Sequence, residues 1–430
     1  MSACLNLVRD DYMYLCNYNQ LINTEIKDLF LEHSADRNIT IKDVDVNESL
    51  IKKKIKKLPQ LIFEVTENCN LRCKYCVYGG TYFNQRKLEP YNMSFDTAMK
   101  GLDYIYSFVK ERKKREFNLS FYGGEPLLNF ETIQQIAEYG KKRFTGWQLH
   151  FNLTTNLTQM DDLVLNYLVE NNFSLLVSLD GDKENHDAKR VFPNGKGSHH
   201  LVMKNLQKIK ERNLEYFNTK IGFSTVHSLD LPLKNLHRFF TTNRLVKNIR
   251  MKFSVVNKYN TSYYERYPYE KDATRKDNKT AMTQLAKKIR EGEELTGYET
   301  SLYNNLKSIG TRLHTRGYTF LAGTCLFDSR LYLDVHGRFH VCEKMNNTFS
   351  FGDVEKGFDF DKMTRIAREF MELIKTHCSN CRVRFLCNRC YAAFCGNGKF
   401  ELDPVFCKNQ EEAIIHNLEK YIENKEIGLI

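Results

Sequence analysis

The feature that most restricts the fold of this chain is a regular alternation of strand-like and helix-like segments through its middle. The helix-like segments, such as Phe95–Lys110 and Leu201–Lys210, repeat apolar residues at helical spacing. Strands that alternate with helices are typical of βα units and a parallel sheet. The expected fold class is therefore α/β, and six units fit either a doubly wound sheet or a partly closed barrel. The predicted strands are Leu61–Thr66, Asn118–Tyr122, Leu149–Thr154, Phe173–Leu179, Lys220–Val226 and Ile249–Val256.

Chemistry-bearing residues follow four successive predicted strands at the point where each strand ends. The first strand runs into a cysteine cluster, and the second ends in Gly123–Pro126. Thr154–Asn156 and Ser178–Gly181 follow the third and fourth strands. Because the carboxyl ends of parallel strands meet at one edge of a sheet, we expect these groups to form one site.

The flanking segments differ in composition from the alternating region. Residues 1–60 show little periodicity and are predicted to form a cap or a substrate-recognition region. Residues 257–320 are first tyrosine-rich and then helical, at Ala281–Arg290 and Leu302–Leu313, which predicts a helical bridge. The expected domains are 1–60, 61–256, 257–320 and a cysteine-rich region at 321–430 that closes with a helix near Glu411–Glu423.

The chain holds 13 cysteines, and their distribution is uneven. Three form an N-terminal cluster, eight lie between Cys325 and Cys407, and none lies from 77 to 324. The first residues have no secretory-signal pattern, so this count predicts metal or redox chemistry rather than a disulfide framework. The expected localisation is cytoplasmic. Cys4 and Cys16 stand alone and are expected to be ordinary buried thiols.

The chain carries a formal net charge of +11, spread over runs such as Ile51–Lys57 and Lys110–Arg115. Such runs most simply form solvated helix faces, and a basic surface can also attract an acidic peptide. No recognition module for nucleic acid accompanies them, and no apolar run approaches the ~18 residues of a membrane span. We therefore expect neither a nucleic acid nor a membrane as a partner.

Cys69, Cys73 and Cys76 place three thiolates on one short loop. Three soft ligands at this spacing suit an iron–sulfur cluster or zinc. With three protein ligands, a four-iron cluster keeps one iron open for a cofactor or substrate. A zinc site completed by a distant histidine is the alternative.

These features together resemble the radical S-adenosylmethionine (SAM) superfamily. Its C-x3-C-x2-C motif directly follows the first strand and has an aromatic residue, here Tyr75, before the last cysteine. Its GGEP element after the second strand resembles Gly123, Gly124, Glu125 and Pro126 of this chain. The resemblance spans the alternating region and implies a partial (β/α)6 barrel with a SAM-binding [4Fe–4S] cluster on the three cysteines.

The resemblance also implies roles for individual residues. In the superfamily, the GGEP backbone and its glutamate hold the methionine amino group of SAM. Ser178 and Asp180, in the stretch SLDG, and Arg190 after it resemble the fourth-strand region that contacts the ribose and carboxylate of SAM. Asn156 resembles a third-strand polar residue that lines the same pocket. Reductive cleavage of SAM in this superfamily yields a 5′-deoxyadenosyl radical.

The C-terminal cysteines resemble the SPASM domain, which holds two auxiliary [4Fe–4S] clusters. Carried over, the first of these clusters would use Cys325, Cys342 and Cys390. Cys395 is the competitor of Cys390, because the spacing here departs from the family pattern. A zinc ribbon is the alternative for this region alone, since Cys-x2-Cys pairs also suit zinc. The second auxiliary cluster would use Cys378, Cys381, Cys387 and Cys407.

Two expectations follow for the first auxiliary cluster. Some family members complete it with a cysteine just upstream, and positions 77–324 hold none. We therefore expect an open iron that binds a substrate thiolate, unless Cys395 fills the position. Glu343 directly follows Cys342, where related sulfatase-maturing enzymes have an aspartate that serves as a base. Glu343 is thus the candidate catalytic residue, and a surface or salt-bridged glutamate is the alternative.

The resemblance implies an enzyme, a radical SAM peptide-modifying oxidoreductase. The first hypothesis is that it modifies a ribosomally synthesised peptide by hydrogen abstraction and forms a thioether or carbon–carbon cross-link. The second is anaerobic sulfatase maturation, the oxidation of a cysteine or serine to formylglycine. The third is a zinc-containing nucleic-acid-binding protein. The expected partners of the enzyme are a precursor peptide and a reductant such as a flavodoxin or ferredoxin.

Overall fold

The computed structural model describes residues 40–41 and 44–426, apart from 84, 259, 314–316, 319–324, 382, 385, 388–389 and 397. Cys4, Cys16 and most of the predicted cap at 1–60 therefore lie outside the described residues. The described part of that cap contains helix α3 (Glu48–Ile55), which packs against α14 (Phe360–Cys378).

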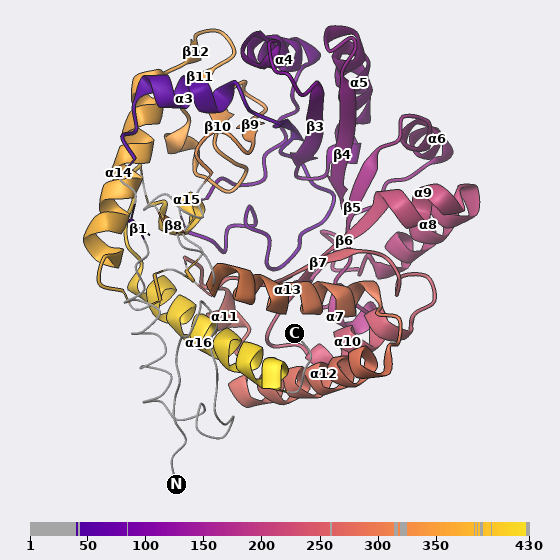
Figure 1. Cartoon of the computed structure of the whole chain (residues 1–430). Helices are drawn as coiled ribbons and strands as arrows, with labels where there is room; N and C mark the ends of the chain where they lie inside the picture. The colour runs from indigo at the N-terminus through magenta and orange to yellow at the C-terminus, as the bar shows by residue number, and fades with distance from the viewer. Residues whose placement is uncertain are drawn as a thin grey trace.

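Eight strands form one sheet in the order β10-β9-β2-β3-β4-β5-β6-β7. Each neighbouring pair from β2 to β7 is parallel, and the sheet curves into a partial ring (Figure 1). Each of the six predicted strands is confirmed to within two residues at either end. The predicted α/β class and partial barrel are also confirmed. The bounds are β2 Gln60–Thr66, β3 Glu116–Gly123, β4 Gln148–Thr155, β5 Ser174–Ser178, β6 Ile221–His227, β7 Met251–Val255, β9 Leu331–Leu333 and β10 Phe339–His340.

Helices connect the strands and cover the outside of the ring (Figure 1). The predicted helix at 95–110 is confirmed as α4, which begins where the Ser94 hydroxyl accepts a hydrogen bond from the N–H of Thr97 at 3.1 Å. The other predicted helices are confirmed as α8, α12, α13 and α16. The bounds are α4 Phe95–Val109, η1 Pro126–Asn129, α5 Phe130–Arg143, α6 Asp162–Glu170, α7 Lys183–Asp187, α8 His199–Arg212, α9 Leu214–Lys220, α10 Leu233–Thr242, α11 Tyr263–Arg266, α12 Lys271–Glu291, α13 Gly297–Leu313, η2 Asn347–Phe349, α15 Tyr391–Phe394 and α16 Pro404–Glu426.

The two faces of the sheet differ in character because strand side chains alternate. On β3, Phe117 and Phe121 belong to the main apolar core between the sheet and the helices. Ser120 lies on the opposite, inner face, where its hydroxyl accepts hydrogen bonds from Gln60 at 2.7 Å and Asn152 at 3.2 Å. The inner face of the ring therefore carries polar side chains next to one another.

Two short strands from the cysteine-rich region extend the barrel sheet. β9 pairs in parallel with β2, with Leu331 opposite Leu61, and β10 pairs antiparallel with β9. The sequence did not predict these strands, since segments of two or three residues carry too little periodicity. Main-chain hydrogen bonds thus join the cysteine-rich region to the barrel.

The remaining elements are small. β1 (Thr40–Ile41) pairs with β8 (Gly317–Tyr318), and β11 (Gly352–Asp353) pairs with β12 (Gly357–Phe358). A second apolar cluster lies where α12, α13 and α16 meet. Within the described part of the chain, no helix is long and apolar enough to cross a bilayer.

Candidate active site

The three predicted cluster cysteines lie on the loop that follows β2, here called the cysteine loop (residues 67–77). One side of this loop is bonded to the segment before α8. The N–H of Arg72 donates to the carbonyl of Val191 at 2.7 Å, and the N–H of Lys74 donates to that of Lys189 at 2.9 Å. The loop is therefore held at the carboxyl edge of the sheet, where the sequence predicts the chemistry.

Gly123 and Gly124 hold the other side of the cysteine loop. The N–H of Gly124 donates to the carbonyl of Thr66, and the N–H of Glu125 to that of Asn68, both at 2.8 Å. A Cβ on Gly123 would lie 2.1 Å from the Thr66 oxygen, and one on Gly124 would lie 2.1 Å from the Asn68 oxygen. Gly123 also has a φ of 144°. These glycines let β3 end in direct backbone contact with the loop, which larger residues would prevent.

Glu125 is buried, and the chain's own donors occupy both of its oxygens. Oε1 accepts from the Thr155 hydroxyl at 2.6 Å and from the N–H of Leu127 at 3.1 Å, and Oε2 accepts from the N–H of Asn156 at 2.6 Å. Burial raises the pKa of Glu125 to about 7, although these hydrogen bonds lower it. Pro126, also buried, begins η1. In this structure Glu125 joins the end of β3 to the end of β4.

Asn156 continues this connection to the cysteine loop. Its side-chain amide donates to Asn70 at 2.9 Å, and its oxygen accepts from the N–H of Thr158 at 3.0 Å. Ser178 ends β5 with a half-buried side chain. The structure thus brings the predicted third-strand and second-strand residues together around the loop.

Asp180 joins the fourth strand end to the cysteine loop. One carboxylate oxygen accepts from the N–H of Val226 at 2.9 Å, and the other accepts from Arg190 at 2.7 Å and from the Tyr75 hydroxyl. The Arg190 guanidinium lies over the Tyr75 ring and 4.0 Å from the Cys73 sulfur. Asp180 therefore fixes a positive charge beside a predicted cluster ligand.

The thiols of the cysteine loop sit in surroundings that suit a bound cation. Burial raises the pKa of Cys69 and Cys73 to about 12, and the neighbouring thiols add to this rise. A metal centre is what would hold such buried thiols as thiolates. No group of three or more His, Cys, Asp or Glu side chains in the described ranges is set for a single ion.

Glu343 directly follows Cys342 and also lies near the cysteine loop. The Tyr78 hydroxyl, two residues after the last loop cysteine, donates to the Glu343 carbonyl at 2.9 Å. Glu343 Oε2 is buried and has no hydrogen-bond partner among the described residues. Burial raises the pKa of Tyr122, on β3, and the charges of Glu343 and Cys76 raise it further. A carboxylate with a free oxygen thus lies close to the cysteine loop.

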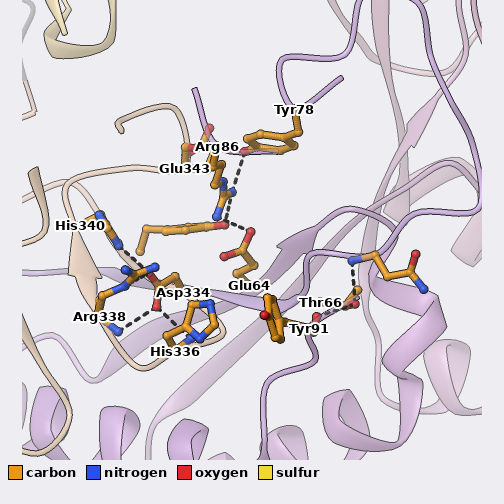
Figure 2. A network of polar contacts seen from close by, with 12 residues as sticks. Glu64, Thr66, Tyr78, Arg86, Tyr91, Asp334, His336, Arg338, His340 and Glu343 are labelled. Atoms are coloured by element: carbon orange, nitrogen blue, oxygen red, sulfur yellow. Dashed lines mark hydrogen bonds and ion pairs between the residues drawn. The ribbon is translucent and has the colours of Figure 1, made fainter. Parts of the chain in front are cut away.

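A buried ion pair that was not predicted from the sequence lies beside Glu343. Figure 2 shows Arg86 against Tyr78 and Glu64. Arg86 forms an ion pair with Glu64, and its Nη2 donates to the hydroxyls of Tyr78 at 2.8 Å and Tyr332 at 2.5 Å. The one signal in the sequence is a glutamate inside the otherwise apolar strand β2.

A second group in Figure 2 surrounds Asp334 in the β9–β10 hairpin. Its carboxylate accepts from His340 at 2.9 Å, from the Arg338 side chain at 2.7 Å and from the N–H of His336 at 3.0 Å. Burial would raise the pKa of Asp334, but the hydrogen bond and charge of His340 and those of Arg338 lower it to about 2. These contacts fix the hairpin that leads directly into Cys342.

The cysteines predicted for the first auxiliary cluster lie near one another. Burial raises the pKa of both Cys342 and Cys390. The nearby Cys390 raises the pKa of Cys342 further, and the nearby Cys325 raises the pKa of Cys390 further. Arg330 hydrogen-bonds the Cys325 thiol and lies near Cys342. Burial raises the pKa of Cys395 to about 12, and Cys390 is the cysteine that adds to it. Cys395, which is buried, therefore lies near Cys390 as well.

The second set of C-terminal cysteines is also grouped. Burial raises the pKa of Cys378 to about 11, and Cys381 and Cys407 add to this rise. Cys381 and Cys387 pack on the smaller apolar cluster, whereas Cys378 and Cys407 pack on the main core. This set lies where the two cores meet.

Comparison with known families identifies the barrel. Residues 63–227 match the family model described as the radical SAM superfamily. The chain therefore contains a radical SAM domain. The cysteine loop and the ends of β2, β3, β4 and β5, where the predicted site residues lie, are within it. The cysteine-rich C-terminal region is consistent with a SPASM domain.

Curated relatives of this chain include radical SAM enzymes of two kinds. A cysteine-type anaerobic sulfatase-maturating enzyme of Clostridium novyi is 30% identical over 189 residues, which are 43% of this chain and 48% of that protein. The radical SAM cyclopropyl synthase TigE of Paramaledivibacter caminithermalis is 23% identical over 405 residues, 89% of this chain and 78% of that protein. The chain spans about half the length of the first curated relatives it matches.

Solved structures share the fold. The structure of anSMEcpe with bound AdoMet has a TM-score of 0.63 at 18% identity, covering 87% of this chain and 100% of that one. The same enzyme with AdoMet and the Cp18Cys peptide has a TM-score of 0.61 at 18% identity, covering 85% and 98%. SuiB of Streptococcus suis bound to its precursor peptide SuiA has a TM-score of 0.50 at 15% identity, covering 90% and 88%.

Proposed function

We propose that this protein modifies a ribosomally synthesised peptide by radical SAM chemistry and forms a thioether or carbon–carbon cross-link. Bound SAM would supply a 5′-deoxyadenosyl radical that abstracts hydrogen from a peptide carbon. The observation that carries the proposal is the cysteine loop, held at the carboxyl edge of a radical SAM domain beside the free carboxylate oxygen of Glu343.

Two relatives support a peptide as the substrate, and a third bears on the bond formed. SuiB was solved with a precursor peptide, and anSMEcpe was solved with the Cp18Cys peptide. TigE, which aligns over most of this chain, is named a cyclopropyl synthase. A cyclopropane ring is closed by a carbon–carbon bond, so this relative supports the carbon–carbon form of the cross-link.

The cofactors of this proposal are SAM and three [4Fe–4S] clusters. The proximity of Cys390 to both Cys325 and Cys342 supports Cys390 as a ligand, and Cys395, which also lies near Cys390, is the alternative. With Cys390 as the third ligand, one iron would stay open for a substrate thiolate. Gly123, Gly124, Glu125, Pro126, Asn156, Ser178, Asp180 and Arg190 surround the SAM position. The SAM-binding cluster uses Cys69, Cys73 and Cys76, and the second auxiliary cluster uses Cys378, Cys381, Cys387 and Cys407.

Glu343 is the general base in this proposal. Its unpartnered oxygen can accept a proton from a substrate group as the new bond forms. Tyr78 and Arg86 act as positioning residues. The Tyr78 hydroxyl donates to the Glu343 carbonyl, and Arg86, which is paired with Glu64, donates to that hydroxyl.

Sulfatase maturation is the second candidate. It is favoured by the match to the Clostridium novyi enzyme and by the higher TM-score of anSMEcpe than of SuiB. The absence of cysteine from positions 77–324 counts against it, since an upstream cysteine completes the first auxiliary cluster in some family members.

Anaerobic reconstitution tests the proposal. The chain with three clusters should bind about 12 irons and, with dithionite and SAM, release 5′-deoxyadenosine. Peptides encoded next to the gene are then supplied, and their masses are measured. A loss of two hydrogens supports a cross-link, whereas an aldehyde that traps a hydrazine supports sulfatase maturation. Failure to form 5′-deoxyadenosine would overturn both.

A further inference from the structure

The free edge of the barrel sheet lies along β7. β7 is the last strand of the sheet (Figure 1), and its register sets Phe223 of β6 opposite Met251. In a parallel ladder, this register turns the main-chain groups of Arg250 and alternate residues toward β6, and Phe223 does donate to the Arg250 carbonyl at 3.0 Å. The N–H and C=O groups of Met251, Phe253 and Val255 then face away from β6. Within the described ranges, none of them bonds to another backbone group.

The side chains of β7 separate into two faces at this edge. Phe253 packs edge-on against Tyr298 of α13, so it lies on the outer face. Lys252 and Ser254 therefore lie on the inner face, and both are exposed. Val255 is 40% exposed, although it is a β-branched residue within the sheet. The edge and the inner face beside it are thus open to another chain.

Cationic side chains lie near Lys252 on this part of the inner face. Partial burial of the exposed Lys252 side chain lowers its pKa, and the nearby cations Lys344 and Arg330 lower it further, whereas Glu343 opposes them. These four residues comprise three cations and one carboxylate. Lys252 forms no ion pair within 4.0 Å in the described part of the chain, so its charge has no close counterion there.

We propose that the substrate peptide pairs with the free edge of β7 as an added strand and places an acidic side chain beside Lys252. An extended peptide uses such an edge through its main chain, and alternate side chains give specificity. Neighbouring strands lie about 4.8 Å apart, so inward side chains of the peptide would flank Lys252 and Ser254. This inference rests on the proposed peptide-modifying function and adds the binding mode and the charge of the substrate.

A competing explanation assigns Lys252 a protective role. Lysine on an edge strand is a common means of preventing aggregation through strand pairing. The two explanations differ in outcome, because a protective lysine opposes peptide pairing whereas a recognition lysine attracts acidic peptides.

The test uses fluorescein-labelled decapeptide pools in which one position is fixed as Asp, Asn or Lys and the others are randomised. Val255→Pro removes one outward N–H at an edge position where proline is tolerated. Val255→Thr is its matched control, since it keeps the N–H and the β-branched shape. We expect Asp-fixed pools to bind the cluster-loaded wild type most tightly. Val255→Pro should weaken this binding by about tenfold or more, and Val255→Thr should leave it unchanged.

The charge is tested at Lys252. Lys252→Gln should abolish the preference for Asp-fixed over Asn-fixed pools, and Lys252→Arg should keep it. Equal binding of the Asp pools by Val255→Pro and wild type, or no preference for Asp in wild type, would overturn the proposal. If Val255→Pro does not fold, hydrogen exchange on the wild type decides. Protection of the amides at 251–255 by Asp-fixed pools supports pairing, and unchanged exchange excludes it.

Every variant is also assayed for 5′-deoxyadenosine without peptide. Loss of that activity in the wild type would refute the proposed function. Retained activity with no edge-dependent binding would refute this inference alone.

Discussion

Asp180 illustrates how a residue's role changes once its partners are known. The resemblance assigns it to the ribose and carboxylate contacts of SAM, yet its oxygens accept from Val226, Arg190 and Tyr75. The carboxylate therefore positions Arg190 beside Cys73. In the structure its direct contacts are with β6, with Arg190 and with the cysteine loop, and its contact with SAM stays a prediction.

Asp180→Asn tests this positioning role. The substitution leaves a buried guanidinium without its counterion, which typically costs about 3–5 kcal/mol. We expect a comparable loss in the free energy of unfolding, measured by denaturant titration, and a changed electron paramagnetic resonance signal of the SAM-binding cluster. Asp96→Asn is the control, because Asp96 pairs with Lys100 at the surface and should cost less than about 1 kcal/mol. Equal stability of the two variants would contradict the assignment.

Glu343→Gln tests the base. It keeps the side-chain shape and the hydrogen bond from Tyr78 to the backbone, but it removes the proton acceptor. Product formation should fall on the order of 10²-fold, while 5′-deoxyadenosine formation persists. Liquid chromatography with mass spectrometry follows both products, and Glu343→Asp should restore part of the activity. Wild-type product yield from Glu343→Gln would remove Glu343 from the mechanism.

At the scale of elements, the end of β3 supports the cysteine loop through two glycines. No side chain fits between the Gly124 backbone and the Asn68 carbonyl. The spacing of strand and loop therefore depends on the absence of two Cβ atoms, and we expect a cluster bound by the loop to depend on that spacing.

Gly124→Ala should displace the loop. The added Cβ would meet the Asn68 oxygen at 2.1 Å, so we expect loss of about four irons per chain and a fall of at least about tenfold in 5′-deoxyadenosine formation. Iron analysis and product quantification measure the two effects. Gly222→Ala is the matched control, since its Cβ would lie 3.4 Å from the nearest atom. Full iron content in Gly124→Ala would show that the loop does not need this contact.

The β9–β10 hairpin depends on Asp334 in a pH-dependent way. The folded pKa of Asp334, about 2, lies below its ordinary 3.8. The resulting stability is present above pH ~4 and is lost as the pH falls toward ~2. Asp334→Asn should therefore lower the free energy of unfolding by about 2 kcal/mol at pH 7. The deficit should shrink below pH ~4, in urea titrations of iron-free chains. A deficit that is constant with pH would contradict the charge-based account.

For the whole molecule, the second C-terminal set of cysteines joins two apolar cores. Replacing Cys378 and Cys381 by alanine should remove about four of about 12 irons and lower the thermal midpoint. The cysteine loop is separate from this set, so cleavage of SAM should persist. Iron analysis, differential scanning calorimetry and 5′-deoxyadenosine assays check these outcomes. Unchanged iron would exclude this set as cluster ligands.

Much of the fold was predictable because the barrel strands are long and alternate with amphipathic helices. The gathering of the functional residues at the strand ends was also predictable, because the carboxyl ends of parallel strands meet at one edge of the sheet. The sequence could not indicate that Glu125 and Asp180 are saturated by the chain's own donors. The bonds from Thr155, Asn156, Val226 and Tyr75 join residues 30 to 105 positions apart. Arg86 and Asp334 were also missed, since isolated charges carry no periodicity and their partners come from distant segments.

The pairing of β9 with β2 has a consequence for engineering. Suppose that two relatives exchange their C-terminal regions at a boundary near residue 320. The β9 strand of one parent would then pair with the β2 strand of the other, and the two would have to match in register. A hybrid chain would keep its cysteine-rich region aligned with the cysteine loop only if β2 and the 331–340 hairpin came from the same parent.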